Sequence, residues 1–279
     1  MIKHILVVVD GSEYSSTAIS YGLYLSKRLH ANLYFQHVID IVFLENPFLH
    51  DISGAMGFEP FIDFSGKVTE ILKERGKQIL LDAEKQCNDE GLKCTTYLDT
   101  GIVTKEICER EKLVDMVIVG QKGVNAQFDR KMLGSTTEGL SRRTTKPLFI
   151  CPKDFKDINS IMLAYDDSNA AKNAIGFAAS FCKELNLRLS VITINKDETS
   201  GREILSKALS YIQPYNINYE TIIKNGSAEK ELTGIMTQDA YDLLIMGSHG
   251  HSRIVEMVLG STAEYVIRNT AKPVIVVKA

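Results

Sequence analysis

The chain has 279 residues, a length typical of about two domains, and its hydrophobic (44%) and charged (24%) fractions exclude collagen-like, disordered and coiled-coil proteins. The 32 Lys and Arg against 35 Asp and Glu give a net charge of −3, which offers no general attraction to nucleic acid or a membrane surface. We therefore expect no nucleic-acid or membrane partner. No apolar run is long enough for a membrane span, and the five cysteines lack CxxC spacing, so we expect a cytoplasmic protein.

The first predicted unit is a strand, a helix and a second strand. Ile5–Val9 and Leu33–Val38 are apolar runs typical of buried strands. From about Ser15 to Leu29 apolar residues recur every three or four positions, as on one face of a helix.

The next segment is unusually apolar for a connection. It lies near Ile41–Gly66, and an exposed surface of this kind would be adhesive. We expect it to pack within the chain, over a cleft of the first half or on the other half. Contact with another chain or with a hydrophobic ligand is the alternative. A surface helix over about Lys67–Asn88 and strands at Met116–Val119 and Pro147–Ile150 follow.

The chain then repeats itself. A segment from Ile158 matches the one from Ile2, so that Asp166 falls 156 positions after Asp10, whereas Asp242 begins a match to the segment from Asp115, only 127 positions earlier. The first copy therefore carries roughly 30 extra residues, which places the insertion at about 41–66. Alternating strands and helices require parallel sheets covered by helices. We predict two tandem open parallel-sheet α/β sandwich domains, at 1–152 and 158–279.

An acid follows the first strand of each copy. These residues are Asp10 and Asp166. Ligands of open parallel sheets bind beyond the carboxyl ends of the strands, where a carboxylate accepts hydrogen bonds from a ribose or an adenine amino group, or helps to hold a metal on a phosphate. The alternative is that each aspartate only caps the helix that follows.

A glycine pattern follows the fourth strand of the second copy. Gly247 and Gly250 precede, after nine residues, Gly260, Ser261 and Thr262 at the start of a predicted helix. The first two glycines allow close approach of the backbone to a ligand, with positive φ where needed, and the N–H groups of a helix start attract anions. The pattern predicts a phosphate cradle. Ordinary turns and N-caps are the alternative.

The first copy carries the same pattern with a ten-residue gap, as Gly120, Gly123, Gly134, Ser135 and Thr136. Cationic side chains in the two loops are candidates for neutralising phosphates, although such residues are commonly just solvated. They are Lys122, Arg130 and Lys131 in the first copy and Arg253 in the second.

Both halves resemble the universal stress protein family, whose nucleotide-binding members carry G-x2-G-x9-G-[ST] after the fourth strand and an Asp after the first. The second copy matches this spacing and the first departs from it by one residue. The resemblance implies adenine nucleotide alpha hydrolase-like domains, with adenine against Val38 and Ile194. It also implies that the last strands, Pro147–Ile150 and Pro273–Val277, pair the halves into a pseudo-symmetric dimer within one chain.

We therefore expect an ATP-binding regulator or stress-response factor that holds ATP with Mg²⁺, most of all in the second half. No catalytic residue is predicted, because no base that would position water is evident, so ATP hydrolysis should be weak or absent. His249 and His251 form an H-x-H pair that is a possible metal site, but contact with the ligand or loop packing is favoured and no protein-held metal is predicted. The alternative function is a scaffold that binds a protein partner or hydrophobic ligand through the insertion, with one or both clefts empty. A homodimer is possible, and the partner is unknown.

Overall fold

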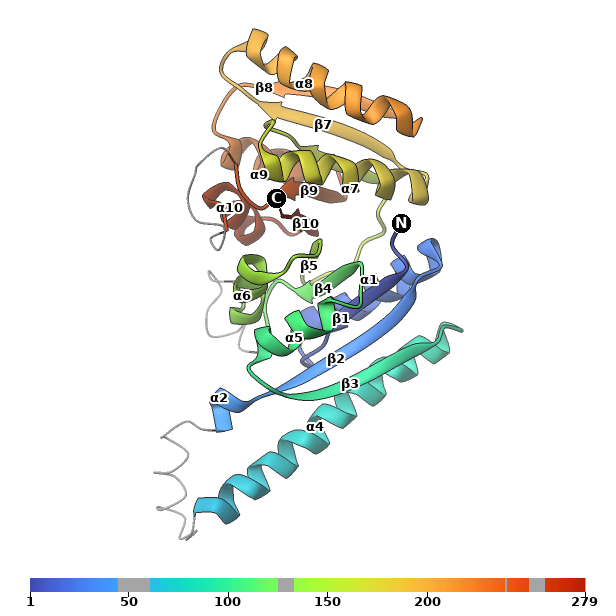
Figure 1. Cartoon of the computed structure of the whole chain (residues 1–279), viewed down its shortest axis with the longest axis vertical. Coiled ribbons are helices and arrows are strands. Elements are labelled where there is room, and N and C mark those ends of the chain that lie inside the picture. Colours follow the sequence, from blue (N-terminus) through green and yellow to red (C-terminus); the bar gives the residue numbers. More distant parts are fainter. Residues whose placement is uncertain (45–60, 125–132, 239, 251–258, 279) are drawn as a thin grey trace.

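The structure is a computed structural model that describes residues 1–44, 61–124, 133–238, 240–250 and 259–278. Its strands form one sheet in the order β3-β2-β1-β4-β5-β10-β9-β6-β7-β8 (Figure 1). The strands are β1 (His4–Val8), β2 (Asn32–Asp40), β3 (Cys94–Gly101), β4 (Met116–Gly120), β5 (Leu148–Cys151), β6 (Ser160–Ala164), β7 (Arg188–Ile194), β8 (Tyr219–Lys224), β9 (Leu243–Gly247) and β10 (Val274–Val277). We refer to β1–β5 with their helices as the first half and to β6–β10 with theirs as the second half.

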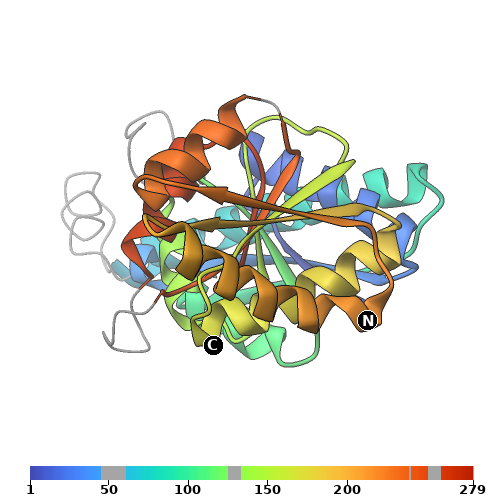
Figure 2. The ribbon, with the colours of Figure 1, turned by 90° about the horizontal axis from the view of Figure 1, so that it is seen from above.

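Helices lie on both sides of the twisted sheet (Figure 2). One face packs against α1 (Glu13–Leu29), α4 (Phe61–Asp89), α7 (Asn169–Leu185) and α8 (Glu198–Ile212). The other face packs against α5 (Val103–Glu111), α6 (Ser135–Arg143), α9 (Ala228–Thr237) and α10 (Ser261–Asn269). The short α2 (Ile41–Leu44) and a 3-10 turn (Gln213–Tyr215) complete the described elements. The prediction of helix-covered, mostly parallel sheets is confirmed.

The halves meet at the middle of the sheet. Each half is parallel throughout, and the only antiparallel neighbours in the described sheet are β5 and β10, where Ile275 lies opposite Phe149 and Val274 opposite Ile150. Both strands are completely buried, so the joint is a continuous apolar layer. The expected pairing of the last strands, and with it the pseudo-symmetric arrangement, is confirmed.

Several predicted bounds differ from the observed ones. The helix α1 begins at Glu13, two residues early, because the side chain of Ser12 accepts a hydrogen bond from the N–H of Ser15 and caps the helix. The helix α4 begins at Phe61, so the end of the predicted insertion is helical. Residues 45–60, the rest of that insertion, lie outside the described residues. Among the described residues, no helix has both the length and the apolar character that a membrane span requires.

Candidate functional site

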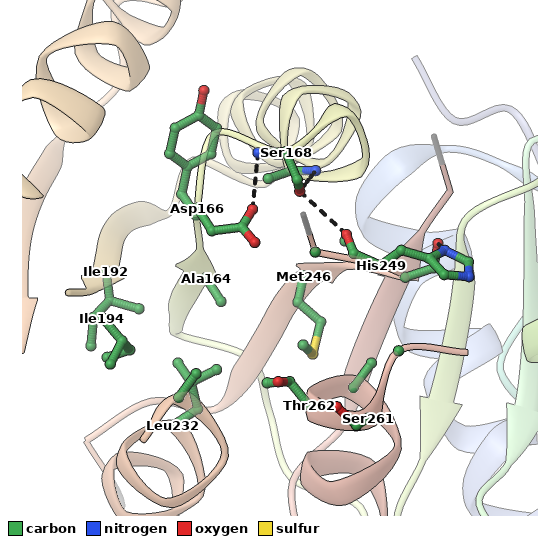
Figure 3. Close-up of a pocket in the computed structure, with 18 residues that line it drawn as sticks. Ala164, Asp166, Ser168, Ile192, Ile194, Leu232, Met246, His249, Ser261 and Thr262 are labelled. Atoms are coloured by element: carbon green, nitrogen blue, oxygen red, sulfur yellow. Dashed lines mark hydrogen bonds between the residues drawn. The ribbon is translucent and has the colours of Figure 1, made fainter. Parts of the chain in front are cut away.

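A pocket opens in the second half beyond the carboxyl ends of β6, β7 and β9. Its volume is about 180 Å³, and α7, α9 and α10 supply its other walls (Figure 3). The structure brings together here most of the residues that the sequence predicted for the second copy, namely Asp166, Ile194, Gly247, His249, Gly250, Gly260, Ser261 and Thr262. The remaining predicted residue, Arg253, lies outside the described residues, as does His251, so only His249 of the H-x-H pair is described.

One end of the pocket is apolar. Ile192 and Ile194 project from β7, Ala164 lies at the end of β6, and Leu232 of α9 faces them (Figure 3). Met246 of β9 lines the pocket between this group and α10. A flat heteroaromatic ring can replace water on such a surface without leaving a buried polar group of the protein unsatisfied.

Asp166 lies between the apolar end and the Gly247–Gly250 loop. Its Oδ1 accepts a hydrogen bond from the N–H of Ser168 at 3.0 Å. The N-cap of α7 is Ser168, whose Oγ accepts from the N–H of Ala171, and the N-cap of α1 is Ser12. The interpretation of Asp10 and Asp166 as helix caps is therefore wrong. The aspartates instead hold the turn before the cap, with the carboxylate at the edge of the pocket.

The opposite end of the pocket is the start of α10. Gly260 is the N-cap of this helix, with φ −62° and no side-chain capping bond, so Ser261 and Thr262 are its first helical residues and not N-caps. The first N–H groups of a helix have no acceptor within the helix, and the helix dipole adds a partial positive charge. This end can therefore hold an anion.

The glycines are explained by close packing. A Cβ on Gly247 would lie 2.8 Å from Cβ of Ala170 in α7, and one on Gly260 would lie 3.0 Å from the carbonyl oxygen of Ser248. A Cβ on Gly250 would lie 3.0 Å from Oδ2 of Asp166. None of the three has a positive φ, so the conformational freedom allowed for at Gly247 and Gly250 is not needed in this structure. The absence of a side chain at these glycines lets the Gly247–Gly250 loop pack against α7, Asp166 and the start of α10.

His249 contributes its main chain to the pocket, and its ring points elsewhere. The carbonyl oxygen of His249 accepts a hydrogen bond from Oγ of Ser168 at 3.2 Å, whereas the imidazole is directed away from Asp166 and Thr262 (Figure 3). Its Nδ1 lies 2.7 Å from Oγ of Ser248. Desolvation, with Lys278 nearby, lowers the pKa of the ring, which favours its neutral form.

The first half has an equivalent pocket of about 410 Å³. It gathers the predicted residues Asp10, Val38, Gly120, Gly123, Gly134, Ser135 and Thr136. Lys122 also lines it, while Arg130 and Lys131 lie outside the described residues. Here both oxygens of Asp10 are engaged with main chain, Oδ1 by the N–H of Ser12 at 2.9 Å and Oδ2 by the N–H of Val124 at 3.2 Å. The predicted residues of the first copy that the structure describes therefore line one pocket, as those of the second copy do.

The model of the universal stress protein family matches residues 1–152 and again residues 158–278. The chain belongs to the universal stress protein family. A universal stress protein of Synechocystis, Slr1230, is 27% identical over 284 residues, covering 98% of this chain and 99% of its own length.

A solved universal stress protein shows the same fold over the whole chain. It comes from Archaeoglobus fulgidus and covers 99% of this chain and 98% of its own, with 23% identity and a TM-score of 0.76. Another from the same organism, solved in complex with dAMP, covers 42% of this chain and 96% of its own, with 22% identity and a TM-score of 0.36. The first match shows that both halves, in this order, form a known architecture.

Sequence reasoning missed several residues of this universal stress protein's pockets. They are Ala164, Ser168, Ile192 and Leu232 in the second half and His37 and Val103 in the first. A signal existed for one of them, because a serine stands two residues after the aspartate in both copies, as Ser12 and Ser168. The others belong to strands and helices whose relative placement only the fold defines. Among the described residues, no cluster of three or more His, Cys, Asp or Glu side chains could hold a metal ion.

Proposed function

We propose that this universal stress protein binds an adenine nucleotide in the pocket of the second half and acts as a nucleotide-dependent regulator or stress-response factor. One observation carries the proposal. A single pocket joins an apolar slot, Ile192, Ile194 and Leu232, to the N-terminus of α10 by way of a carboxylate. A base, a sugar and a phosphate need these three environments in this order.

The orientation of the nucleotide follows from this arrangement. The adenine lies against Ile194 and Leu232, the ribose lies beside Asp166, and the phosphates reach the N–H groups of Ser261 and Thr262. The hydroxyls of Ser261 and Thr262 add two donors at the same end of α10. Gly247 and Gly250 act indirectly, by letting the loop close against α7 and Asp166.

ATP with Mg²⁺ is the proposed ligand. The described residues offer no metal cluster, so Mg²⁺ would be held mainly by phosphate oxygens, with Asp166 as a carboxylate in the pocket. When bound, Mg²⁺ neutralises phosphate charge. His249 is not suited to activate water in the pocket, because its ring faces away, and hydrolysis is therefore weak or absent.

The first half is proposed as a second nucleotide site of the same design. Val38 takes the place of Ile194, and Ser135 and Thr136 start α6 as Ser261 and Thr262 start α10. Lys122 lines this pocket at the position equivalent to His249, whose ring points away from the pocket of the second half.

The test distinguishes binding of the base from binding of the phosphates. Thr262→Glu places a carboxylate at the start of α10, and we expect affinity for AMP and ATP at the second site to fall by about tenfold or more while adenosine binding changes less than about twofold. Ala164→Leu fills the apolar end and should weaken all three ligands. Calorimetric titration with adenosine, AMP and ATP measures these affinities.

The first half provides the matched controls. Thr136→Glu and Val8→Leu make the corresponding changes there and should leave the second site unaffected. Wild-type protein that takes up none of the three ligands would contradict the proposal, and so would equal losses for adenosine and ATP in Thr262→Glu.

A further inference from the structure

Gln121 crosses from the first half to the second. It follows Gly120 at the end of β4, and its side chain is buried, with 8% of the residue exposed. The amide nitrogen Nε2 donates to the carbonyl oxygen of Ile267 and lies 3.5 Å from that of Thr270. Both carbonyls belong to the C-terminal end of α10, the helix whose first residues line the pocket of the second half.

The main chain of Gln121 is fixed within the first half. Its N–H donates to the carbonyl oxygen of Cys151 at 2.7 Å, and its carbonyl oxygen accepts from the N–H of Gly134 at 3.0 Å. Gly134 is the N-cap of α6. The side chain therefore extends from a rigid point, and α10 is tied at its far end to a strand end of the other half.

The contact is specific to Gln121 and does not follow from the repeat. The equivalent residue of the second half is Ser248, whose Oγ bonds to Nδ1 of His249. The C-terminal end of α6 receives a different donor, because Nζ of Lys278 donates to the carbonyl oxygen of Arg142. The short helix behind each pocket thus ends on a donor from the opposite half.

Such a donor acts on the whole helix. The last carbonyls of an α-helix have no partner within the helix and carry its partial negative charge. The helix α10 has nine residues, about two and a half turns, so a constraint at Thr270 is transmitted to Ser261 by a rigid element only about 13.5 Å long. A donor at the C-terminal end also stabilises the alignment of the N–H groups at the start.

We propose that Gln121 is a positioning residue for the anion end of the second-half pocket, so that a residue of the first half sets the affinity of the second-half site. This rests on the proposed nucleotide function of that pocket. Gln121 does not touch the ligand. It holds α10 at the angle and depth at which the N–H groups of Ser261 and Thr262 meet a phosphate.

The test uses the full chain and a reporter on α10. The chain has no tryptophan, and Tyr265 of α10 is 42% exposed, so Tyr265→Trp introduces a sole tryptophan on this helix. In that background Gln121→Met removes the donor at similar size, and Gln121→Glu replaces it with a negative charge beside the negative end of the helix. AMP and adenosine are titrated against each variant by fluorescence and calorimetry.

We expect AMP affinity at the second site to fall about three- to tenfold in Gln121→Met and further in Gln121→Glu, with adenosine nearly unchanged. A role in packing alone would not separate the two ligands or rank the two variants. Tyr21→Phe is the matched control, since it removes a buried hydroxyl that donates to Lys156 between the halves without contact to α10.

The outcomes are distinct. Unchanged AMP affinity in folded Gln121 variants of a protein that binds AMP overturns the positioning role, and so does an equal loss in Tyr21→Phe. If the unsubstituted protein binds neither ligand, the proposed function fails instead. Should a variant not fold, as judged by circular dichroism, Gln121→Asn replaces it, because Asn keeps the amide but reaches one methylene less, and the same direction of change is expected.

Discussion

Ser168 and His249 are joined along one wall of the second-half pocket by a hydrogen bond of 3.2 Å from the serine Oγ to the histidine carbonyl oxygen (Figure 3). The same Oγ accepts the N–H of Ala171 at 3.2 Å. One hydroxyl therefore caps α7 and fixes the Gly247–Gly250 loop against the helix that it caps.

Ser168→Ala should lower both stability and ligand affinity. It removes the cap and the loop contact together, and we expect the free energy of unfolding to fall by about 1–2 kcal/mol. The loop then loses its side-chain hydrogen bond to the start of α7, so nucleotide affinity at the second site should also fall. Urea denaturation and calorimetric titration measure the two effects.

Ser12→Ala is the control for this prediction. Ser12 caps α1 by accepting from the N–H of Ser15 at 3.1 Å, in the first half. Its loss should cost about as much stability and leave the second site unaffected. An equal loss of second-site affinity in both variants would show that the effect is general destabilisation.

Phe149→Ala should strongly destabilise the joint between the halves. Phe149 is fully buried in β5, lies opposite Ile275 of β10, and has its ring centroid 5.0 Å from that of Tyr21. We expect a loss of about 3–5 kcal/mol by chemical denaturation, since the cavity lies where both halves pack. Phe155→Ala is the comparison, because Phe155 also contacts Tyr21 but is 42% exposed, and it should cost much less. A similar small cost for both variants would contradict a shared core at the joint.

The repeat predicted the fold well because strand positions are encoded twice. Matching apolar runs placed β1, β2, β4 and β5 to within a residue or two, and the last-strand pairing followed from the family resemblance. No bounds were derived for the edge strands β3 and β8, which are only partly buried and mix polar with apolar residues. Edge strands with a mixed pattern give a weak periodic signal.

The sequence predicted which residues form the candidate site, but not why glycine is required at its positions. Gly247 fits both a ligand contact and tight packing on Ala170, and a sequence cannot separate the two, because each demands the absence of a Cβ. The same holds for Gly260, where a Cβ would lie 3.0 Å from the carbonyl oxygen of Ser248. Gln121 could not be found, because its partners are main-chain carbonyls more than 140 positions away, at separations of 146 and 149.

Cys94 should alkylate slowly although it is partly exposed. Burial, with the hydrogen-bonded Cys87 beside it, raises the pKa of the Cys94 thiol to about 12, and desolvation also raises the pKa of Cys87. Because the thiolate is the nucleophile, its fraction at pH 8 should be about a thousandfold below that of an ordinary thiol. Mass spectrometry after timed iodoacetamide treatment, with glutathione as the reference, measures the rate. Labelling of Cys94 in the folded protein as fast as glutathione would contradict this environment.

Asp167 should make a stabilising contribution that is lost in acid. Asp167 has a left-handed backbone conformation with φ 65°. Its carboxylate accepts a hydrogen bond from Nζ of Lys207 at 2.8 Å and lies 3.3 Å from Nζ of Lys172. The hydrogen bond to Lys207 holds the pKa of Asp167 below its ordinary value of 3.8, so the folded state favours the charged form. The contribution is therefore fully present above about pH 5 and declines as the pH falls through the lowered pKa.

Asp167→Asn isolates this contribution, since Asn tolerates the left-handed backbone as Asp does. Both lysines are mostly exposed, so the variant should lose less than about 1 kcal/mol at neutral pH, and less again in high salt. Urea denaturation of both proteins between about pH 7 and pH 2 measures the difference, which should shrink toward zero at the acid end. Lys207→Met should reproduce most of the neutral-pH loss, because it removes the partner with the larger effect. A difference between wild type and Asp167→Asn that stays constant with pH would mean that the cost comes from the backbone or from packing, and not from the ion pairs.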